Sequence, residues 1–236
     1  MRNRNEILNF LVGCEESQAV CIELRKLGHN AFSCDTQECS GNHPQWHFQM
    51  DIFEVIKGGY LTTQSGEVVY IDKWHCGIFF PPCTYISYAG TRHWNNPGRL
   101  EKRLQALGFF GSLYNCGIEY ICIENPRGCA SPTVAKYTQL INPYYFGDSF
   151  SKPTCLWLKG LPELVHNKKT DLFNISTHVD KGEFVEFTTK KGKIKKEAKW
   201  YRELGGKGKE RSKTFPGIAK AMASQWSEFI LETINK

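Results

Sequence analysis

The pattern that most constrains the fold is at residues 9–35, where two apolar segments enclose one with helical periodicity. Asn9 to Gly13 predicts a buried strand that ends in a glycine, and residues 19–27 carry apolar side chains at the spacing of a helix. Residues 30–34 predict a second strand, which ends in Asp35. This order of elements begins a Rossmann-like nucleotide site, in which an acid about 20 residues beyond the glycine turn binds ribose hydroxyls.

The loop after the first predicted strand departs from the usual dinucleotide-binding pattern. It lacks Gly-x-Gly-x-x-Gly, and Glu15 and Glu16 would repel a pyrophosphate. The loop therefore favours a cofactor with a positive centre and no phosphates, such as S-adenosylmethionine. Asp51, in a third predicted strand at residues 49–52, is placed to hold an adenine amino group. A plain strand–helix–strand unit that binds nothing is the alternative.

A cysteine follows the next predicted strand on a stiff turn. The apolar run from Gly77 to Phe80 predicts a buried strand, and Pro81 and Pro82 end it. Cys83 comes directly afterwards, at the carboxyl end of the strand, where open α/β sheets bind their ligands. Because the thiolate is the nucleophile of cysteine chemistry, this position suits covalent catalysis. The alternative is a buried structural cysteine after a Pro-Pro turn.

A carboxyl group ends a later predicted strand. Residues 120–123 are apolar, and Glu124-Asn125-Pro126 follows. We place this strand two strands away from the Cys83 turn, with Glu124 facing the same cleft. A desolvated glutamic acid can stay protonated and donate a hydrogen bond to a ring nitrogen. An ion-paired glutamate in a Glu-Asn-Pro turn is the alternative.

The positive charge of the chain is concentrated in one segment. The formal net charge is +6, and residues 166–213 hold 14 Lys and Arg against 7 Asp and Glu. Such a local excess is the footprint of a nucleic-acid contact, although a solvated lysine-rich hairpin has the same composition. The segment predicts a hairpin from residues 184–189 and from 194 onward. The lysines expected to contact phosphates are Lys190, Lys191, Lys193, Lys207 and Lys209.

Composition excludes several classes of protein. At 236 residues the chain suits one domain with a modest appendage, and no apolar run reaches the roughly 18 residues of a membrane span. The first six residues are polar and show no signal-peptide pattern, so we expect a cytoplasmic protein. Ten cysteines occur without a Cys-x-x-Cys pair, which favours reduced thiols and no metal site.

Two motifs together resemble those of the carbon-5 cytosine DNA methyltransferases. Residues 82–87 (Pro-Cys-Thr-Tyr-Ile-Ser) match their Pro-Cys-x-x-x-Ser loop, and residues 124–126 (Glu-Asn-Pro) resemble their Glu-Asn-Val signature. The resemblance implies that Cys83 adds to carbon 6 of a flipped-out cytosine while Glu124 binds ring nitrogen 3 and the exocyclic amine. The methyl group of S-adenosylmethionine is then transferred to carbon 5. As a compact methyltransferase without a nuclease, the chain resembles phage and prophage members.

The resemblance also implies a fold and further site residues. It implies an α/β, Rossmann-like S-adenosylmethionine-dependent methyltransferase sheet with helices on both faces, plus a small basic insertion. Where the family has paired arginines, this chain has Lys152 and Thr154, so we take Lys152 as a catalytic cation and Arg211 as a substitute for the missing charge. The implied cofactor residues are Gly13, Glu15, Glu16, Ser17, Asp35, Asp51 and Pro81, and Ser87 and Arg92 are expected at the nucleic acid.

The resemblance divides the chain into three parts. Residues 1–164 form a catalytic methyltransferase domain, 165–213 a small basic segment for target recognition, and 214–236 a C-terminal helix that returns to the catalytic domain. The expected partner is double-stranded DNA, bound in a strongly salt-dependent way. We expect a monomer with no membrane or metal partner, in the cytoplasm of a bacterial or phage-infected cell.

Three other functions remain compatible with the sequence. Amino-methyltransferases use an Asp/Asn/Ser-Pro-Pro-aromatic loop, and residues 80–83 (Phe-Pro-Pro-Cys) have its prolines without the acid, amide or following aromatic. Thymidylate-synthase-like enzymes also attack carbon 6 with a Pro-Cys cysteine, but the nucleotide-binding first half argues against their folate donor. A non-catalytic nucleic-acid-binding protein on a methyltransferase scaffold would keep the basic segment. The sequence leaves the target sequence open, and with it the choice between DNA and RNA.

Overall fold

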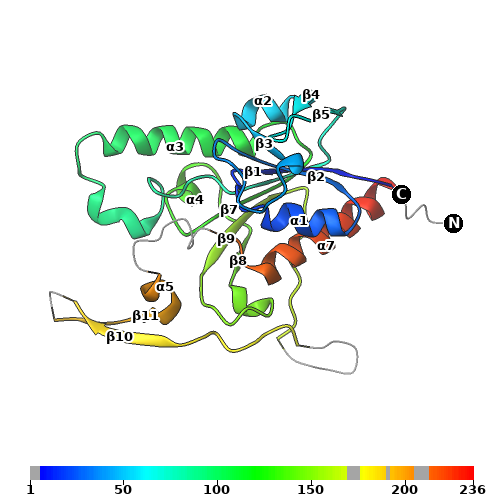
Figure 1. Cartoon of the computed structure of the whole chain (residues 1–236). Helices are drawn as coiled ribbons and strands as arrows, with labels where there is room; N and C mark the ends of the chain where they lie inside the picture. Colours follow the sequence, from blue (N-terminus) through cyan, green and yellow to red (C-terminus); the bar gives the residue numbers. More distant parts are fainter. Residues whose placement is uncertain (1–5, 169–175, 190–191, 205–212) are drawn as a thin grey trace.

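A seven-stranded sheet forms the centre of the molecule (Figure 1). The computed structural model describes residues 6–168, 176–189, 192–204 and 213–236. The strand order is β3-β2-β1-β6-β7-β9-β8, and β9 alone runs antiparallel to both of its neighbours. The strands are β1 (Asn9–Gly13), β2 (Asn30–Asp35), β3 (His47–Gln49), β6 (Cys76–Phe79), β7 (Tyr120–Asn125), β8 (Gln139–Ile141) and β9 (Thr154–Lys159).

The order of the strands fixes where a ligand would bind. The chain runs outward from β1 to β3 and then crosses to β6 on the other side of β1, so the order reverses between β1 and β6. Open α/β sheets bind ligands outside the carboxyl ends of the strands at such a switch point. Here those ends are Gly13 and Phe79, which are paired in register. The predicted α/β class is confirmed, and the mostly parallel sheet is compatible with a Rossmann-like fold.

Helices cover both faces of the sheet, as expected (Figure 1). One core contains α1 (Ala19–Lys26) and α7 (Pro216–Ile234), and its largest side chain is Trp226. The opposite core contains α2 (Ile52–Ile56) and α3 (Arg99–Tyr114). The strands between them are buried on both faces, which explains why β1 is apolar without alternation.

Smaller elements connect or extend this framework. β4 and β5 form an antiparallel hairpin before β6. A second hairpin, β10–β11, continues into α5 and lies outside the main sheet (Figure 1). The bounds are β4 (Gly59–Thr62), β5 (Val68–Ile71), β10 (Phe184–Thr188), β11 (Ile194–Ala198), α4 (Ala130–Thr133), α5 (Lys199–Glu203), and the 3-10 helices η1 (Pro44–Trp46), η2 (Tyr88–His93) and η3 (Pro143–Tyr145).

The structure corrects the sequence-based placement of two acids. β6 and β7 are direct neighbours, so Glu124 lies on the strand next to the Cys83 turn and not two strands away. Glu124 also lies within β7 itself. The third strand ends at Gln49, and Asp51 caps the helix that follows. Both differences arise because pairing partners and strand ends depend on tertiary contacts that local patterns do not encode.

The described part of the chain bears on two of the expected partners, a membrane and a metal ion. None of the helices described is both long and apolar enough to cross a bilayer. Across the same residues, no group of three or more His, Cys, Asp or Glu side chains is arranged to hold a metal ion. The monomeric state and the cytoplasmic location stay predictions.

A buried polar network supports the β2–β3 end of the sheet. The Gln18 Nε2 atom donates to Ser33 Oγ at 3.1 Å, and Ser33 Oγ lies 2.8 Å from His47 Nδ1. The His47 Nε2 atom lies 2.9 Å from the Gln37 carbonyl oxygen, so Nε2 carries a proton that it donates. His47 is fully buried, and this burial lowers its pKa below the ordinary value.

The lowered pKa of His47 predicts a loss of stability in acid. The unfolded His47 binds a proton below about pH 6.5 and the folded residue does not, so the free energy of unfolding falls as the pH drops through that value. Between about pH 7 and about pH 5.5, the free energy of unfolding of the wild type is expected to fall by up to about 1 kcal/mol more than that of His47→Gln. Urea unfolding of both proteins at the two pH values measures this difference, and equal losses would contradict it.

Candidate active site

The loops after β6 and β7 are held together at the carboxyl edge of the sheet. Asn125, the last residue of β7, donates from Nδ2 to the Pro81 carbonyl oxygen at 2.7 Å in a buried position. Further along the two loops, the Cys129 amide donates to the Ile86 carbonyl oxygen at 2.9 Å. The two sequence motifs therefore lie side by side at this edge. That they line one cleft stays a prediction.

Cys83 begins a turn that presents its side chain to solvent. Its carbonyl oxygen accepts from the amides of Ile86 (3.1 Å) and Ser87 (2.9 Å), which fixes the backbone directly after the two prolines. Cys83 is exposed, whereas the cysteines within the strands of the main sheet are buried. The alternative of a buried structural cysteine does not hold at this position.

Glu124 lies beside Thr154 and Lys152. Glu124 pairs with Leu156 across the antiparallel β7–β9 pair, so Thr154, two residues away on β9, is its diagonal neighbour on the same face. Burial raises the pKa of the Glu124 carboxyl group, while the Lys152 ammonium and a hydrogen bond with the Thr154 side chain act against the rise. The resulting pKa is above the ordinary value, which favours the protonated form that the sequence analysis requires.

The charges around Cys83 act in opposite directions. Desolvation and the nearby Glu124 carboxyl group raise the pKa of the Cys83 thiol, and the Lys152 ammonium lowers it. The net direction is upward, so the thiol of the free protein is largely protonated near neutral pH. These electrostatic contacts bring Cys83, Glu124 and Lys152 together from three separate parts of the chain.

Lys152 is held from the side of the C-terminal helix. Its Nζ atom lies 3.5 Å from the Lys213 carbonyl oxygen and 5.8 Å from the ring centroid of Phe215, the residue before α7. Arg211, which the sequence analysis offered as a second cation, lies outside the described residues. Among the described residues, Lys152 is thus the cation that acts on both Cys83 and Glu124.

Glu15 has a structural role in the first loop. Gln18 stands at the N-cap of α1 in a left-handed conformation and makes no capping bond there, and Glu15 Oε1 instead accepts from the Val20 amide at 3.0 Å. Burial raises the pKa of Glu15 to about 8. Glu15 is therefore mostly neutral at pH 7, so the Glu15–Glu16 pair repels a pyrophosphate less than its sequence suggests.

Two acids, one at the end of β2 and one at the N-cap of α2, nevertheless lie near Cys14, which follows β1 with a φ of 59°. Burial raises the pKa of the Cys14 thiol, and the charges of Asp35 and Asp51 raise it further. The Glu15 Oε2 atom is buried and has no hydrogen-bond partner within the described residues. The Asp35 and Asp51 carboxylates are acceptors for hydroxyl groups and an amine, the donors that a ribose and an adenine carry.

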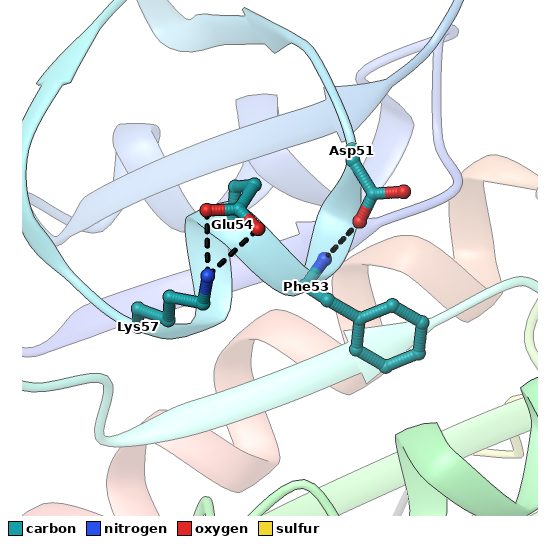
Figure 2. A network of polar contacts seen from close by, with 4 residues as sticks. All are labelled: Asp51, Phe53, Glu54 and Lys57. Carbon is teal, nitrogen blue, oxygen red and sulfur yellow. Dashed lines mark hydrogen bonds and ion pairs between the residues drawn. The ribbon is translucent and has the colours of Figure 1, made fainter.

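Asp51 keeps part of its carboxylate away from α2. Its Oδ1 atom accepts from the Phe53 amide at 2.8 Å, which caps the helix. Figure 2 shows the second oxygen of Asp51 pointing away from α2, while Glu54 and Lys57 form an ion pair of 2.7 Å on the next turn. The cap of α2 therefore uses one oxygen of Asp51, and the other points away from the helix.

The other residues expected at the cofactor have roles in the framework. A Cβ atom at Gly13 would lie 2.6 Å from Phe79 and 2.7 Å from Ile52, so this glycine permits close packing beneath the edge. The Pro81 carbonyl oxygen accepts from Asn125. Glu16 is buried, and its backbone carbonyl accepts from the Ser40 amide at 2.8 Å, whereas Ser17 is half-buried.

The residues expected at the nucleic acid are dispersed. Ser87 is 7% exposed and its Oγ atom accepts from the Ala89 amide, so its side chain caps η2. Arg92 is exposed and donates to His93 at 2.9 Å. Lys193 is exposed, and its backbone closes the β10–β11 hairpin through Thr189. Lys190, Lys191, Lys207 and Lys209 lie outside the described residues.

Sequence reasoning missed a group of cations that follows Cys83. Arg99 donates to the Thr84 carbonyl oxygen at 2.8 Å and its guanidinium lies 4.4 Å from the Tyr85 ring centroid. Arg103 lies 3.9 Å from the Trp94 ring centroid. Both arginines come from the first turns of α3, and the helical spacing of four was the signal that placed them on one side. Aromatic and guanidinium groups next to Cys83 suit a nucleic-acid surface.

Comparison of the chain with protein-family models and with curated proteins finds no match. The function must therefore be argued from the geometry and chemistry of the site.

Proposed function

We propose that the chain is an S-adenosylmethionine-dependent DNA methyltransferase that acts on carbon 5 of a flipped-out cytosine. The observation that carries the proposal is the convergence of Cys83, Glu124 and Lys152 at the carboxyl edge of the sheet. A thiol, a carboxyl group with a raised pKa and a cation are the groups needed to add a nucleophile to carbon 6 of a pyrimidine. The adjacent acidic edge supports the choice of cofactor.

The side chains divide the reaction between them. The Cys83 thiol loses its proton to solvent, and its sulfur forms a bond to carbon 6 as the electron pair of the 5,6 double bond moves to carbon 5. Lys152 favours the thiolate. Glu124, whose protonated form is favoured by burial, donates to ring nitrogen 3 and accepts from the exocyclic amine, which stabilises the charge that develops on the ring.

The cofactor supplies an electrophilic methyl group when bound. Asp35 and Asp51 would hold its ribose hydroxyls and adenine amino group. Once carbon 5 carries the methyl group, loss of the carbon-5 proton and cleavage of the bond between Cys83 and carbon 6 restore the double bond. Cys83 leaves as a thiolate and is ready for a further turnover.

Transfer of labelled methyl groups tests the proposal. The purified protein is incubated with labelled S-adenosylmethionine and mixed-sequence duplex DNA, and the nucleosides are separated. Label on 5-methylcytosine is expected. Label on an exocyclic amine would assign the chain to the amino-methyltransferases, and DNA retention at low salt without any transfer would favour a non-catalytic binding protein. A parallel reaction with duplex RNA of the same sequence separates the two nucleic acids.

A further inference from the structure

The β10–β11 hairpin and α5 form one structural unit, which we call the arm (residues 184–188 and 194–203). Figure 1 shows the hairpin extending away from the seven-stranded sheet, with α5 against it. The Lys199 amide donates to the Glu183 carbonyl oxygen at 2.9 Å, and the two side chains form an ion pair of 2.6 Å. The Arg202 guanidinium lies 4.6 Å from the Phe187 ring centroid. Hairpin and helix are thereby tied together.

Three aromatic rings connect the arm to the body of the protein. Trp200 of α5 meets Phe150 at a centroid distance of 5.7 Å and Phe215 at 5.6 Å, both edge to face. Phe150 and Phe215 are 5.1 Å apart. Such aromatic pairs contribute roughly 0.5–1.5 kcal/mol each beyond their buried area. We call these three residues the root cluster, because they join the arm to the segment before β9 and to the start of α7.

The root cluster is directly connected to Lys152. The Trp200 Nε1 atom donates to the Ser151 carbonyl oxygen at 3.3 Å, and Ser151 immediately precedes Lys152 in the chain. On the other side, the Lys152 ammonium lies 5.8 Å from the Phe215 ring centroid. Trp200 therefore contacts both the backbone that leads into Lys152 and the Phe215 ring that lies near the Lys152 ammonium.

A lysine needs such support to act at a fixed point. Its side chain has four rotatable bonds and loses about 2 kcal/mol of rotamer entropy when it is ordered. Thr154 and Glu124 lie on paired strands, but Lys152 precedes β9 and has no ladder bond to hold it. Its position thus depends on the Lys213 carbonyl oxygen and on the root cluster.

We propose that Trp200 is a positioning residue, which couples the arm to Lys152 so that a duplex bound by the arm fixes the cation beside Cys83 and Glu124. The sequence that contains the arm is suited to a polyanion, because residues 181–204 hold eight Lys and Arg against four Glu. The response of this coupling to bound DNA rests on the proposed function. The positioning of Lys152 by Trp200, and its effect on the Cys83 thiol, can be tested without that function.

The first test needs neither DNA nor cofactor. The rate at which iodoacetamide alkylates Cys83 is measured against pH, with the Cys83 peptide followed by mass spectrometry. Below the pKa this rate follows the thiolate fraction. Trp200→Ala is expected to slow alkylation about threefold at neutral pH, because a released Lys152 no longer favours the thiolate. Lys152→Met is expected to slow it at least as much.

The double variant shows whether Trp200 acts through Lys152. Trp200→Ala with Lys152→Met is expected to match Lys152→Met alone, since residues in one network have non-additive effects. Trp200→Phe keeps a ring in the root cluster and should recover most of the wild-type rate. Tyr60→Ala removes an 81% exposed ring from the β4–β5 hairpin and serves as the control. An unchanged profile in Trp200→Ala, or fully additive effects, would overturn the coupling.

The second test examines the coupling during turnover. Trp200→Ala is expected to lower kcat for methyl transfer about tenfold with a smaller change in the KM for DNA. Lys195→Ala, on the exposed surface of β11, should mainly raise that KM. The opposite pattern would reduce Trp200 to a support for DNA binding. If no variant or wild type transfers methyl groups, the proposed function fails, while the alkylation profile still decides whether Trp200 positions Lys152.

Discussion

Cys83→Ser is expected to lower the rate of methyl transfer by about 10,000-fold or more. A serine hydroxyl at this position has the same reach, but it ionises far less than a thiol and is a much weaker nucleophile. Because Cys83 is exposed and the exchange replaces one atom, the variant should keep its stability to within about 0.5 kcal/mol. Labelled methyl transfer to duplex DNA and thermal unfolding measure the two effects.

Cys39→Ser is the matched control for this substitution. Cys39 is half-buried in the loop after β2, and its amide donates to Gln64, so the same atom exchange is made away from the edge of β6. It should retain the wild-type rate. Equal losses in both variants would point to a general effect of thiol removal, and a Cys83→Ser enzyme with full activity would rule out the covalent step.

A trapped adduct separates the covalent role of Cys83 from a role in binding. In a duplex that contains 5-fluorocytosine, carbon 5 carries fluorine in place of the proton that must leave after methylation. The bond between Cys83 and carbon 6 should therefore persist, and a protein–DNA band should survive denaturation. The band is expected for wild type and for Cys39→Ser, and its formation should require S-adenosylmethionine. A band with Cys83→Ser would assign the adduct to another residue.

Local patterns were sufficient for most of the secondary structure. The strand at Asn9–Gly13 has the bounds that its apolar run predicts, and the helix predicted at residues 19–27 occurs as α1 (Ala19–Lys26), because each buries a continuous apolar segment or face. The antiparallel insertion of β9 between β7 and β8 was not predictable. Strands of three to six residues carry no signal for their partners, so the neighbour relation of Glu124 and Thr154 depends on tertiary packing.

The candidate site was predictable in part for the same reason. Cys83 follows β6 and Glu124 lies near the end of the neighbouring parallel strand β7, and the carboxyl ends of parallel strands meet at one edge. Asn125 and Thr154 gained their roles only through contacts across loops and strands. The raised pKa of Glu15 depends on complete burial of its side chain, which a loop sequence with two adjacent acids does not suggest.

Gly128 determines how closely the two active-site loops approach each other. It forms an isolated antiparallel bridge with Ser87. Its backbone also lies directly against Ile86, the residue before Ser87. A Cβ atom at Gly128 would overlap the Ile86 carbonyl oxygen and lie 3.1 Å from the Ser87 Cα atom. These neighbours are backbone atoms, so no side-chain rotation can relieve the overlap. The two loops would have to separate.

Gly128→Ala is therefore expected to destabilise the protein by about 2–4 kcal/mol and to lower methyl transfer at least about 100-fold. The larger part of the loss in activity should persist under conditions where the variant is folded, because separation of the loops moves Cys83 away from Glu124.

Gly108→Ala makes the same chemical change in α3, where a Cβ atom meets nothing within 4 Å. That control should gain up to about 1 kcal/mol from its helix propensity and keep full activity. Chemical unfolding and labelled methyl transfer measure both variants. If Gly128→Ala were as stable and as active as Gly108→Ala, close contact between the loops could not be what holds Cys83 and Glu124 in place.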